Sequence, residues 1–175
     1  MYKKRVLKVK GGEKMPIGTK KIEEQIEEYA DMVYRLAFSR TKSKEEAEDI
    51  FQEVFLTLHQ KKPEFENKEH EKAWIIRVTI NKSKKLLNSS WKKKQTLLEK
   101  ELKEEFPEEN MEILEEVLTL PLKYRTIIHL FYYEGYSVKQ ISKLLHLTES
   151  NVKMRLARAR KKLKEQWEGG EVDGK

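Results

Sequence analysis

The sequence predicts an all-α protein made of two small helical domains joined by an acidic linker. Apolar residues recur at helical spacings over residues 22–94 and again over 121–165. Between them, residues 95–120 hold nine glutamates against two lysines. Only seven glycines and four prolines interrupt the 175-residue chain, and it has no hairpin pattern or internal repeat. We also expect a basic, disordered extension over 1–21 and a flexible tail over 166–175.

The composition restricts the partners and the location of the chain. Charged residues make up 38% of it, and the net charge is +7. Such a balance suits a polyanionic partner, either nucleic acid or an acidic protein. No apolar run approaches the roughly 18 residues that cross a membrane, and the basic start lacks the apolar stretch of a secretory signal. We therefore expect a cytoplasmic protein.

The sequence offers no chemistry for catalysis. The absence of cysteine excludes disulfides and thiolate metal sites, and the four histidines lack metal-ligand spacing. The chain has no glycine-rich phosphate loop, and its glutamates follow helical surface patterns that do not indicate a hydrolytic pair. We expect no catalytic site, no metal, no cofactor and no small-molecule substrate.

The second domain contains a helix-turn-helix pattern in "GYSVKQISKLLHLTESNVKMRLARARKKLK". Ser137 and Gln140 have the spacing of a capping box, and Thr148 is a suitable N-cap for the next helix. The connection between the two helices is short, as a helix-turn-helix requires. The preceding segment, "LPLKYRTIIHLFYYEG", predicts a covering helix that ends near Gly135.

The helix that follows Thr148 combines an apolar seam with a positively charged surface. The seam consists of Val152, Leu156, Ala159 and Leu163. Residues 151–164 hold seven cations and no anion. A solvated helix of a bundle would explain the charge, but the capped double-helix pattern favours a reader of the DNA major groove. The candidate DNA contacts are Thr148, Ser150, Asn151, Lys153, Met154, Arg155, Ala157, Arg158, Arg160, Lys161 and Lys162.

In the first domain, "AEDIFQEVFLTLHQ" has a core side and a polar side. The core stripe consists of Ala47, Ile50, Phe51, Val54 and Leu58. Leu56 lies instead in the middle of the polar side, which holds Asp49, Gln52, Glu53 and Gln60. An apolar residue inside a polar rim is typical of an interface anchor, although a single exposed leucine can also have no function.

The segment "AWIIRVTINKSKKLLNSSWKKK" predicts a helix with apolar residues on two sides, held between partners. A polar stripe runs between those sides and consists of Arg77, Asn81, Lys84 and Asn88, with Lys85 at its border. Residues 82–94 hold six cations and no anion. A solvated helix edge explains the lysines, but it explains less well why asparagines alternate with cations.

Both domains resemble parts of one bacterial family. The segment "LPLKYRTIIHLFYYEGYSVKQISKLLHLTESNVKMRLARARKKLK" resembles region 4 of group IV, or extracytoplasmic function (ECF), sigma factors. "EEAEDIFQEVFLTLHQKKPEFENKEHEKAWIIRVTINKSKKLLNSSWKKK" resembles their region 2. The resemblance covers about residues 22–165 and includes the order of the regions, the short connector and the lack of a middle domain. Gln140 and Ser142 depart from the glutamate and alanine that are usual in the family.

The resemblance implies an alternative sigma factor that binds core RNA polymerase, recognises promoter DNA and starts transcription. The helix-turn-helix would read the −35 element and contact the β flap, and region 2 would bind the β′ coiled coil and open the −10 element. The implied polymerase contacts are Asp49, Gln52, Glu53 and Leu56. The implied −10 contacts are Asn67, Lys68, Glu69, His70, Arg77, Asn81, Lys84, Lys85 and Asn88. An anti-sigma factor, often membrane-bound in this family, would regulate the chain.

Two other functions are compatible with the residues alone. One is an autonomous helix-turn-helix regulator whose first domain senses a signal or dimerises, and which binds an operator tightly without polymerase. The other is a structural helical adaptor that binds no DNA. A transcription assay with purified core polymerase separates these alternatives from a sigma factor.

Overall fold

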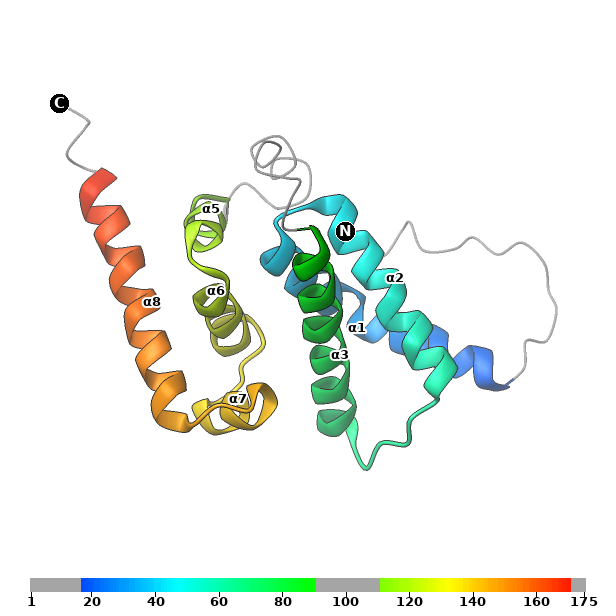
Figure 1. Ribbon diagram of the computed structural model, residues 1–175. Helices are drawn as coiled ribbons and strands as arrows, with labels where there is room; N and C mark the ends of the chain where they lie inside the picture. Colours follow the sequence, from blue (N-terminus) through cyan, green and yellow to red (C-terminus); the bar gives the residue numbers. More distant parts are fainter. Residues whose placement is uncertain (1–16, 91–110, 171–175) are drawn as a thin grey trace.

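The computed structural model describes residues 17–90 and 111–170, and all regular structure within these ranges is helical. The predicted all-α class is therefore confirmed. The remaining parts of the predicted extension, linker and tail lie outside the described residues. In chain order the helices are α1 (Ile17–Thr41), α2 (Lys44–Lys61), α3 (Lys68–Ser90), α5 (Met111–Thr119), α6 (Leu122–Ile128), the π-helix η3 (His129–Tyr133), α7 (Val138–Leu145) and α8 (Glu149–Gly170). Helices α1–α3 form one group and α5–α8 a second group beside it (Figure 1).

The first domain is a bundle in which α1 packs against both α2 and α3. Ser43 caps the start of α2 by accepting a hydrogen bond from the Glu46 backbone N–H. The predicted core stripe of α2 is buried except for Phe51, which is half-buried and packs against the buried Phe55 ring. From α3, Ile75 and Ile76 are both fully buried and close the bundle.

The second domain is built around α6, which packs against α8. Its fully buried side chains come from different elements and include Ile127, Leu130, Ile141 and Val152. The capping box of Ser137 and Gln140 is present, and Thr148 accepts a hydrogen bond from the Asn151 backbone N–H. The short α7, the tight connection and the first turns of the longer α8 therefore form the predicted helix-turn-helix.

Three helix boundaries differ from those expected from the sequence. α1 begins at Ile17, inside the stretch assigned to the extension, and α8 continues to Gly170, inside the stretch assigned to the tail. α5 lies within the stretch assigned to the linker. Its residues Val117 and Leu118 are buried, so this part of the acidic segment is a helix of the second domain. The many glutamates of the segment led to its assignment as a linker, although it contains these buried apolar residues.

The chain turns sharply between η3 and α7. The Glu134 backbone N–H donates to the His129 carbonyl, and the Tyr136 N–H donates to the Leu130 carbonyl. Between them Gly135 has φ +71, a left-handed conformation in which a side chain would be strained. The turn places Glu134 and Tyr136 beside the first domain, where both line a pocket at the domain junction.

Two buried arginines join the domains. Arg125 of α6 donates from Nε to the Ser39 carbonyl (2.7 Å) and from Nη2 to the Arg40 carbonyl (3.0 Å) at the end of α1. Its Nη1 donates to the carbonyls of Leu118 and Leu120. Arg40 in turn donates to the Thr126 hydroxyl. Burial lowers the pKa of both guanidinium groups to about 10, so both stay charged at neutral pH.

The seam of α8 generates a stability prediction. Leu156 is 3% exposed, and Leu156→Asp should destabilise the second domain by about 3 kcal/mol or more, because it removes apolar burial and places a carboxylate in the core. Ala157→Asp is the matched control, since Ala157 is the next residue of the same helix and is exposed. Chemical unfolding followed by circular dichroism measures both variants. Equal stability of the two would contradict the assignment of the seam.

Candidate nucleic-acid interfaces

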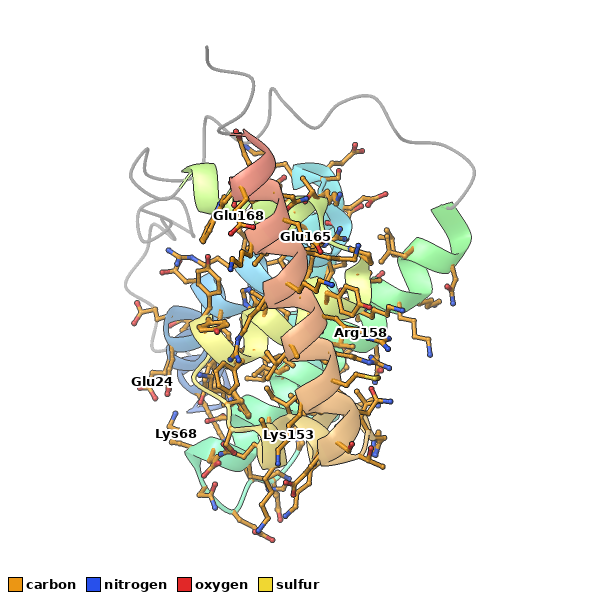
Figure 2. The ribbon with its side chains drawn as sticks, turned by 90° about the vertical axis from the view of Figure 1, so that its left-hand side faces the viewer. Glu24, Lys68, Lys153, Arg158, Glu165 and Glu168 are labelled. Carbon is orange, nitrogen blue, oxygen red and sulfur yellow. The ribbon has the colours of Figure 1, made fainter. Side chains whose placement is uncertain are left out.

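The outer face of α8 is the first candidate interface. Val152, Leu156 and Ala159 are buried and Leu163 is half-buried, so the predicted seam is confirmed. The opposite side is exposed and consists of Ser150, Lys153, Met154, Ala157, Arg158, Lys161 and Lys162. Figure 2 shows α8 along the front of the molecule, with Lys153 and Arg158 on it. This side combines small or apolar groups with cations, as contact with base edges and phosphates requires.

The remaining candidates on this helix are already engaged or partly covered. Thr148 uses its hydroxyl oxygen to cap the helix, and Asn151 and Arg155 are half-buried. Arg160 donates from Nε to the Tyr132 hydroxyl (2.8 Å). Its guanidinium also lies 5.7 Å from the ring centre of Phe131 and 5.6 Å from that of Tyr132. Arg160 therefore fixes α8 against η3 in this structure, a contact that helical spacing alone could not reveal.

The polar stripe of α3 is the second candidate interface. Arg77, Asn81, Lys84, Lys85 and Asn88 are all exposed, as predicted. On the inner side, Thr79 and Ser83 are fully buried and donate to the carbonyls one turn earlier. Lys82 lies at the edge of the stripe and forms an ion pair with Glu53 of α2, at 3.0 Å. The packing of α3 leaves the stripe free along the helix.

The loop before α3 is held in place by its own side chains. Asn67 accepts a hydrogen bond from the His70 backbone N–H (2.8 Å) and so caps the helix. The Phe65 ring packs edge-on against both His70 and Trp74. Asn67, Lys68, Glu69 and His70 are all exposed. The structure thus brings the four predicted loop residues together at the start of the helix that carries the polar stripe.

Glu71 anchors this segment to α1, and no sequence pattern indicates this role. Its carboxylate is buried, where it accepts hydrogen bonds from Gln25 and Tyr29 of α1 and pairs with Lys68 at 3.1 Å. Burial alone would raise the pKa of Glu71, but the hydrogen bonds from Gln25 and Lys68 lower it below its ordinary value. The carboxylate therefore stays charged and fixes the start of α3 to α1.

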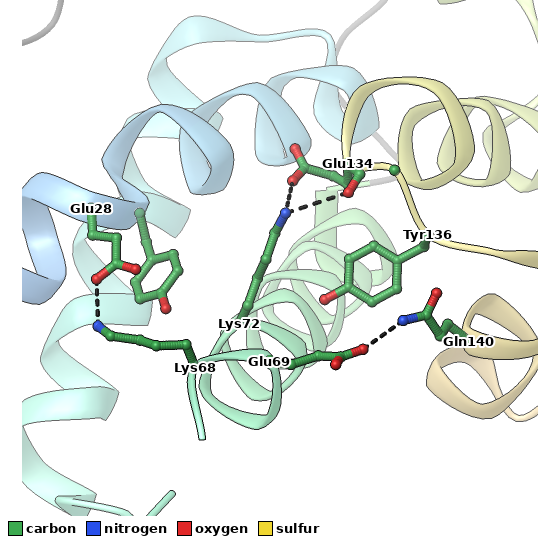
Figure 3. A pocket seen from close by; sticks show the side chains of 9 residues that line it. Glu28, Lys68, Glu69, Lys72, Glu134, Tyr136 and Gln140 are labelled. Atoms are coloured by element: carbon green, nitrogen blue, oxygen red, sulfur yellow. Dashed lines mark hydrogen bonds and ion pairs between the residues drawn. The ribbon is translucent and has the colours of Figure 1, made fainter. Parts of the chain in front are cut away.

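A pocket of about 360 Å³ lies where the start of α3 meets the second domain. Figure 3 shows Lys68 paired with Glu28, Lys72 paired with Glu134, and Glu69 bonded to Gln140. Of the predicted loop residues, Glu69 therefore contacts the second domain, while Lys68 lines the same pocket but pairs within the first domain. These contacts join residues far apart in the sequence, and no local pattern indicates them.

The exposed side of α2 carries the predicted interface anchor. Leu56 is 55% exposed, and its predicted neighbours Asp49, Gln52 and Glu53 are exposed as well. A single exposed leucine is ordinary on a protein surface, so this exposure leaves Leu56 accessible to a partner and does not by itself indicate one. A second apolar surface lies on the other domain, in a pocket of about 490 Å³ lined by residues that include Val117, Tyr132, Leu163 and Trp167.

The described residues contain no cluster of side chains that could hold a metal ion. Across the same ranges, none of the helices has the length and apolar character that crossing a membrane requires.

Two family descriptions match the chain. "Sigma-70 region 2" matches residues 25–93, and "Sigma-70, region 4" matches residues 110–163. The chain is also similar to two ECF RNA polymerase sigma factors of Bacillus subtilis (strain 168). SigM is 31% identical, over 87% of this chain and 98% of its own length. SigW is 27% identical, over 95% of this chain and 96% of its own length.

Solved structures share the fold. The sigma factor RpoE in complex with the anti-sigma factor NepR from Bartonella quintana has a TM-score of 0.68 and 17% identity, over 85% of this chain and 98% of that one. CnrH in complex with the cytosolic domain of CnrY has a TM-score of 0.66 and 19% identity, over 86% of this chain and 90% of that one. These similarities establish the arrangement of the helices.

Proposed function

The chain belongs to the sigma-70 family as an ECF sigma factor that directs promoter recognition by RNA polymerase, and from that premise we propose which of its surfaces contacts each promoter element. α8 reads the −35 element, while α3 and the loop before it open the −10 element. The observation that carries this division is that both helices bury one side in a core and expose a polar, cationic side. Membership of the family sets aside the autonomous regulator and the structural adaptor, and it makes the chain a non-enzymatic protein.

The −35 contact follows from the chemistry of the α8 face. Arg158 and Lys153 donate to guanine edges, and an arginine that donates twice to one guanine is the commonest specific contact. Met154 and Ala157 come close to the base pairs and contact thymine methyl groups. Lys161 and Lys162 lie further along the helix and bind phosphates, which fixes register without selecting sequence.

The −10 contact requires a melted strand. The polar stripe of α3 binds the non-template strand, and residues 67–70, the cap and first turn of α3, receive a base turned out of the stack. Extruding a base costs a few kcal/mol, which stacking, hydrogen bonds and phosphate contacts offset. The capped, anchored loop supports this role because its polar groups are positioned before the base arrives.

Two apolar surfaces fit contacts with core polymerase. Leu56, surrounded by Asp49, Gln52 and Glu53, fits a contact with the β′ coiled coil as an anchor with a polar rim. The apolar pocket that includes Tyr132 (55% exposed) and Trp167 (52% exposed) fits the β flap. With one anchor on each domain, polymerase holds both readers at once, and each raises the effective concentration of the other on the promoter.

An anti-sigma factor fits the same surfaces. The structures of RpoE with NepR and of CnrH with CnrY show that relatives of this fold are held by anti-sigma factors. We place the action of this chain in the cytoplasm, with its polymerase, and we propose that its own anti-sigma factor, either membrane-bound or free, covers the polymerase-binding and DNA-binding faces.

The β′ contact is tested with Leu56→Asp. The variant should weaken binding to core polymerase by about 2 kcal/mol, roughly 30-fold, because a charge replaces a buried anchor. The fold should survive, since Leu56 lies outside the core. A fluorescence titration with purified core polymerase measures the affinity, with Leu56→Met as the matched apolar control. Unchanged affinity of Leu56→Asp would refute the assignment.

The −10 role is tested with Asn81→Ala. The variant should impair promoter opening more than it impairs polymerase binding, because it removes hydrogen bonds that form only with the melted strand. Permanganate footprinting of the −10 region measures the unpaired thymines. A template already melted at −10 should partly rescue the variant, since the cost of unpairing is met. Thymine reactivity equal to that of the unmutated protein on duplex DNA would show that Asn81 has no such role.

The −35 role is tested by comparing Arg158→Ala with Lys162→Ala. Arg158→Ala should cost about 1–3 kcal/mol of discrimination at one base pair. Lys162→Ala should weaken all sequences alike and lower the salt slope of binding by about one unit. A promoter library transcribed with each holoenzyme measures both effects. The same uniform loss for both variants would mean that α8 grips only the DNA backbone.

A further inference from the structure

The apolar pocket on the second domain has the size of a small-molecule site, and cations line its edge. Its volume is about 490 Å³, within the range of about 300–1,000 Å³ typical of such sites. We propose that it binds a free amphipathic carboxylate, such as a medium-chain fatty acid, with the carboxylate at Arg160 and Lys164 and the apolar tail among the aromatic rings. The consequence for polymerase binding rests on the β flap contact proposed above, whereas the binding itself does not.

Four elements build the pocket. Val117 of α5 and Ile128 of α6 line it and are buried, so they form its floor. The walls come from η3 and α8, and α8 contacts both α5 and α6 (Figure 1). Near the far end of α8, Gln166 donates from its amide to the Thr119 hydroxyl of α5 at 2.7 Å. This bond holds α8 against α5, so the pocket is formed before a ligand arrives.

Three aromatic side chains form most of the walls. Tyr132, Tyr133 and Trp167 all line the pocket and are all exposed. Five large apolar side chains are exposed in the described ranges, so this one site holds three of them. Single exposed apolar residues are ordinary, but a cluster of them around a hollow indicates a ligand or a partner.

The charges around the pocket favour an anion. Of the described residues that line it, Arg160 and Lys164 carry a charge, and none is an aspartate or a glutamate. Arg160 donates from Nε to the Tyr132 hydroxyl and forms no ion pair within the described ranges. Its Nη1 and Nη2 atoms can therefore donate to a ligand, and the planar guanidinium matches a planar carboxylate.

Lys164 can exchange its present partner for a ligand. Its amine lies 3.3 Å from the Glu168 carboxylate, and both side chains are largely exposed. An exposed pair of this kind contributes little to stability, so a ligand carboxylate can take the place of Glu168. A cationic amphiphile would meet two cations at the same edge. The pocket should therefore distinguish an anionic from a cationic head group on one and the same tail.

The volume of the pocket limits the length of the tail. At roughly 30 Å³ for each heavy atom, the share of one water molecule in the liquid, the pocket of about 490 Å³ admits about 16 heavy atoms. Decanoate is below this limit, whereas a long-chain fatty acid would leave part of its tail in solvent. Decanoate is therefore a suitable probe of the site.

A bound carboxylate would cover Tyr132 and Trp167, which belong to the surface proposed to meet the β flap. Lys153 and Arg158 do not line the pocket, so the face proposed to read the −35 element stays accessible. Ligand and β flap would therefore compete for one surface, and by linkage each weakens the binding of the other. Through this site, free carboxylates would lower the affinity of the chain for polymerase.

Isothermal titration calorimetry of the full-length chain tests the site directly. Decanoate should bind with a Kd below about 1 mM, as expected of a ligand of its size. Decyltrimethylammonium has the same tail with a cationic head, and acetate has the carboxylate without the tail. Each should bind at least about tenfold more weakly than decanoate. No binding of decanoate at this concentration, or equal binding of decyltrimethylammonium, overturns the proposal.

Variants locate the bound decanoate. Trp167→Ala removes a wall of the pocket and Lys164→Glu reverses a charge at its edge, so each should weaken decanoate binding about tenfold. Both residues are exposed, and circular dichroism should show unchanged helix content. Lys143→Glu is the matched charge control, because Lys143 is exposed on α7 and does not line the pocket. Unchanged affinity in Trp167→Ala and Lys164→Glu, or an equal loss in Lys143→Glu, overturns the assignment of the site.

Competition is measured by titration with purified core polymerase. Decanoate at about three times its Kd should weaken polymerase binding of the unmutated chain about threefold. Trp167→Ala binds decanoate poorly and should lose much less. An equal loss in Trp167→Ala would mean that decanoate acts on polymerase itself, which overturns the competition.

The ligand site and the β flap contact fail in different ways. If only the β flap contact is wrong, Trp167→Ala binds polymerase as tightly as the unmutated chain, while calorimetry still shows that decanoate binds. If only the ligand site is wrong, Trp167→Ala weakens polymerase binding, while decanoate does not bind the unmutated chain.

Discussion

Each helix proposed to meet DNA also holds its own domain together, and the rest of the structure depends on this double use. α8 buries Val152 and Ala159 completely while it exposes Lys153 and Arg158 on the opposite side. α3 buries Ile75 and Ile76 and keeps its polar stripe in solvent. The position of a residue around the helix axis therefore decides whether its side chain packs in the core or is available to contact DNA. Recognition can change on the outer face while the domain keeps its stability.

Local patterns were sufficient to predict much of the fold. The seam of α8, the capping box of Ser137 and the exposure of Leu56 all follow from spacings of three and four along one helix. The helix α5 was missed because glutamates dominate the longer segment of residues 95–120 in which it lies, although α5 itself is mostly apolar and buries Val117 and Leu118. The exposure of the candidate DNA-binding residues was predictable for the same reason, whereas their roles remain predictions.

Contacts between distant segments could not be predicted. The hydrogen bond from Arg160 to Tyr132 joins α8 to η3, 28 positions earlier in the chain. The carboxylate of Glu71 reaches Gln25, more than forty positions earlier in the chain. In the sequence, Arg160 and Glu71 look like ordinary charged residues. No local pattern indicates which distant segment either of them contacts. These residues set the tilt of α8 and the start of α3, which a helical wheel leaves undetermined.

The domain junction and the DNA-binding faces differ in how ionic strength acts on them. Arg125 is 6% exposed and donates to neutral carbonyls, so dissolved ions neither reach it nor compete for its partners. Lys72 and Glu134 pair at 2.9 Å, and the Glu134 side chain is only 9% exposed, so salt screens this pair far less than it screens charges in open solvent. Added salt does weaken the hold of exposed lysines on phosphates, because counterions compete for the DNA backbone. A rise in cellular potassium would therefore loosen the grip on promoter DNA while the contacts between the domains persist.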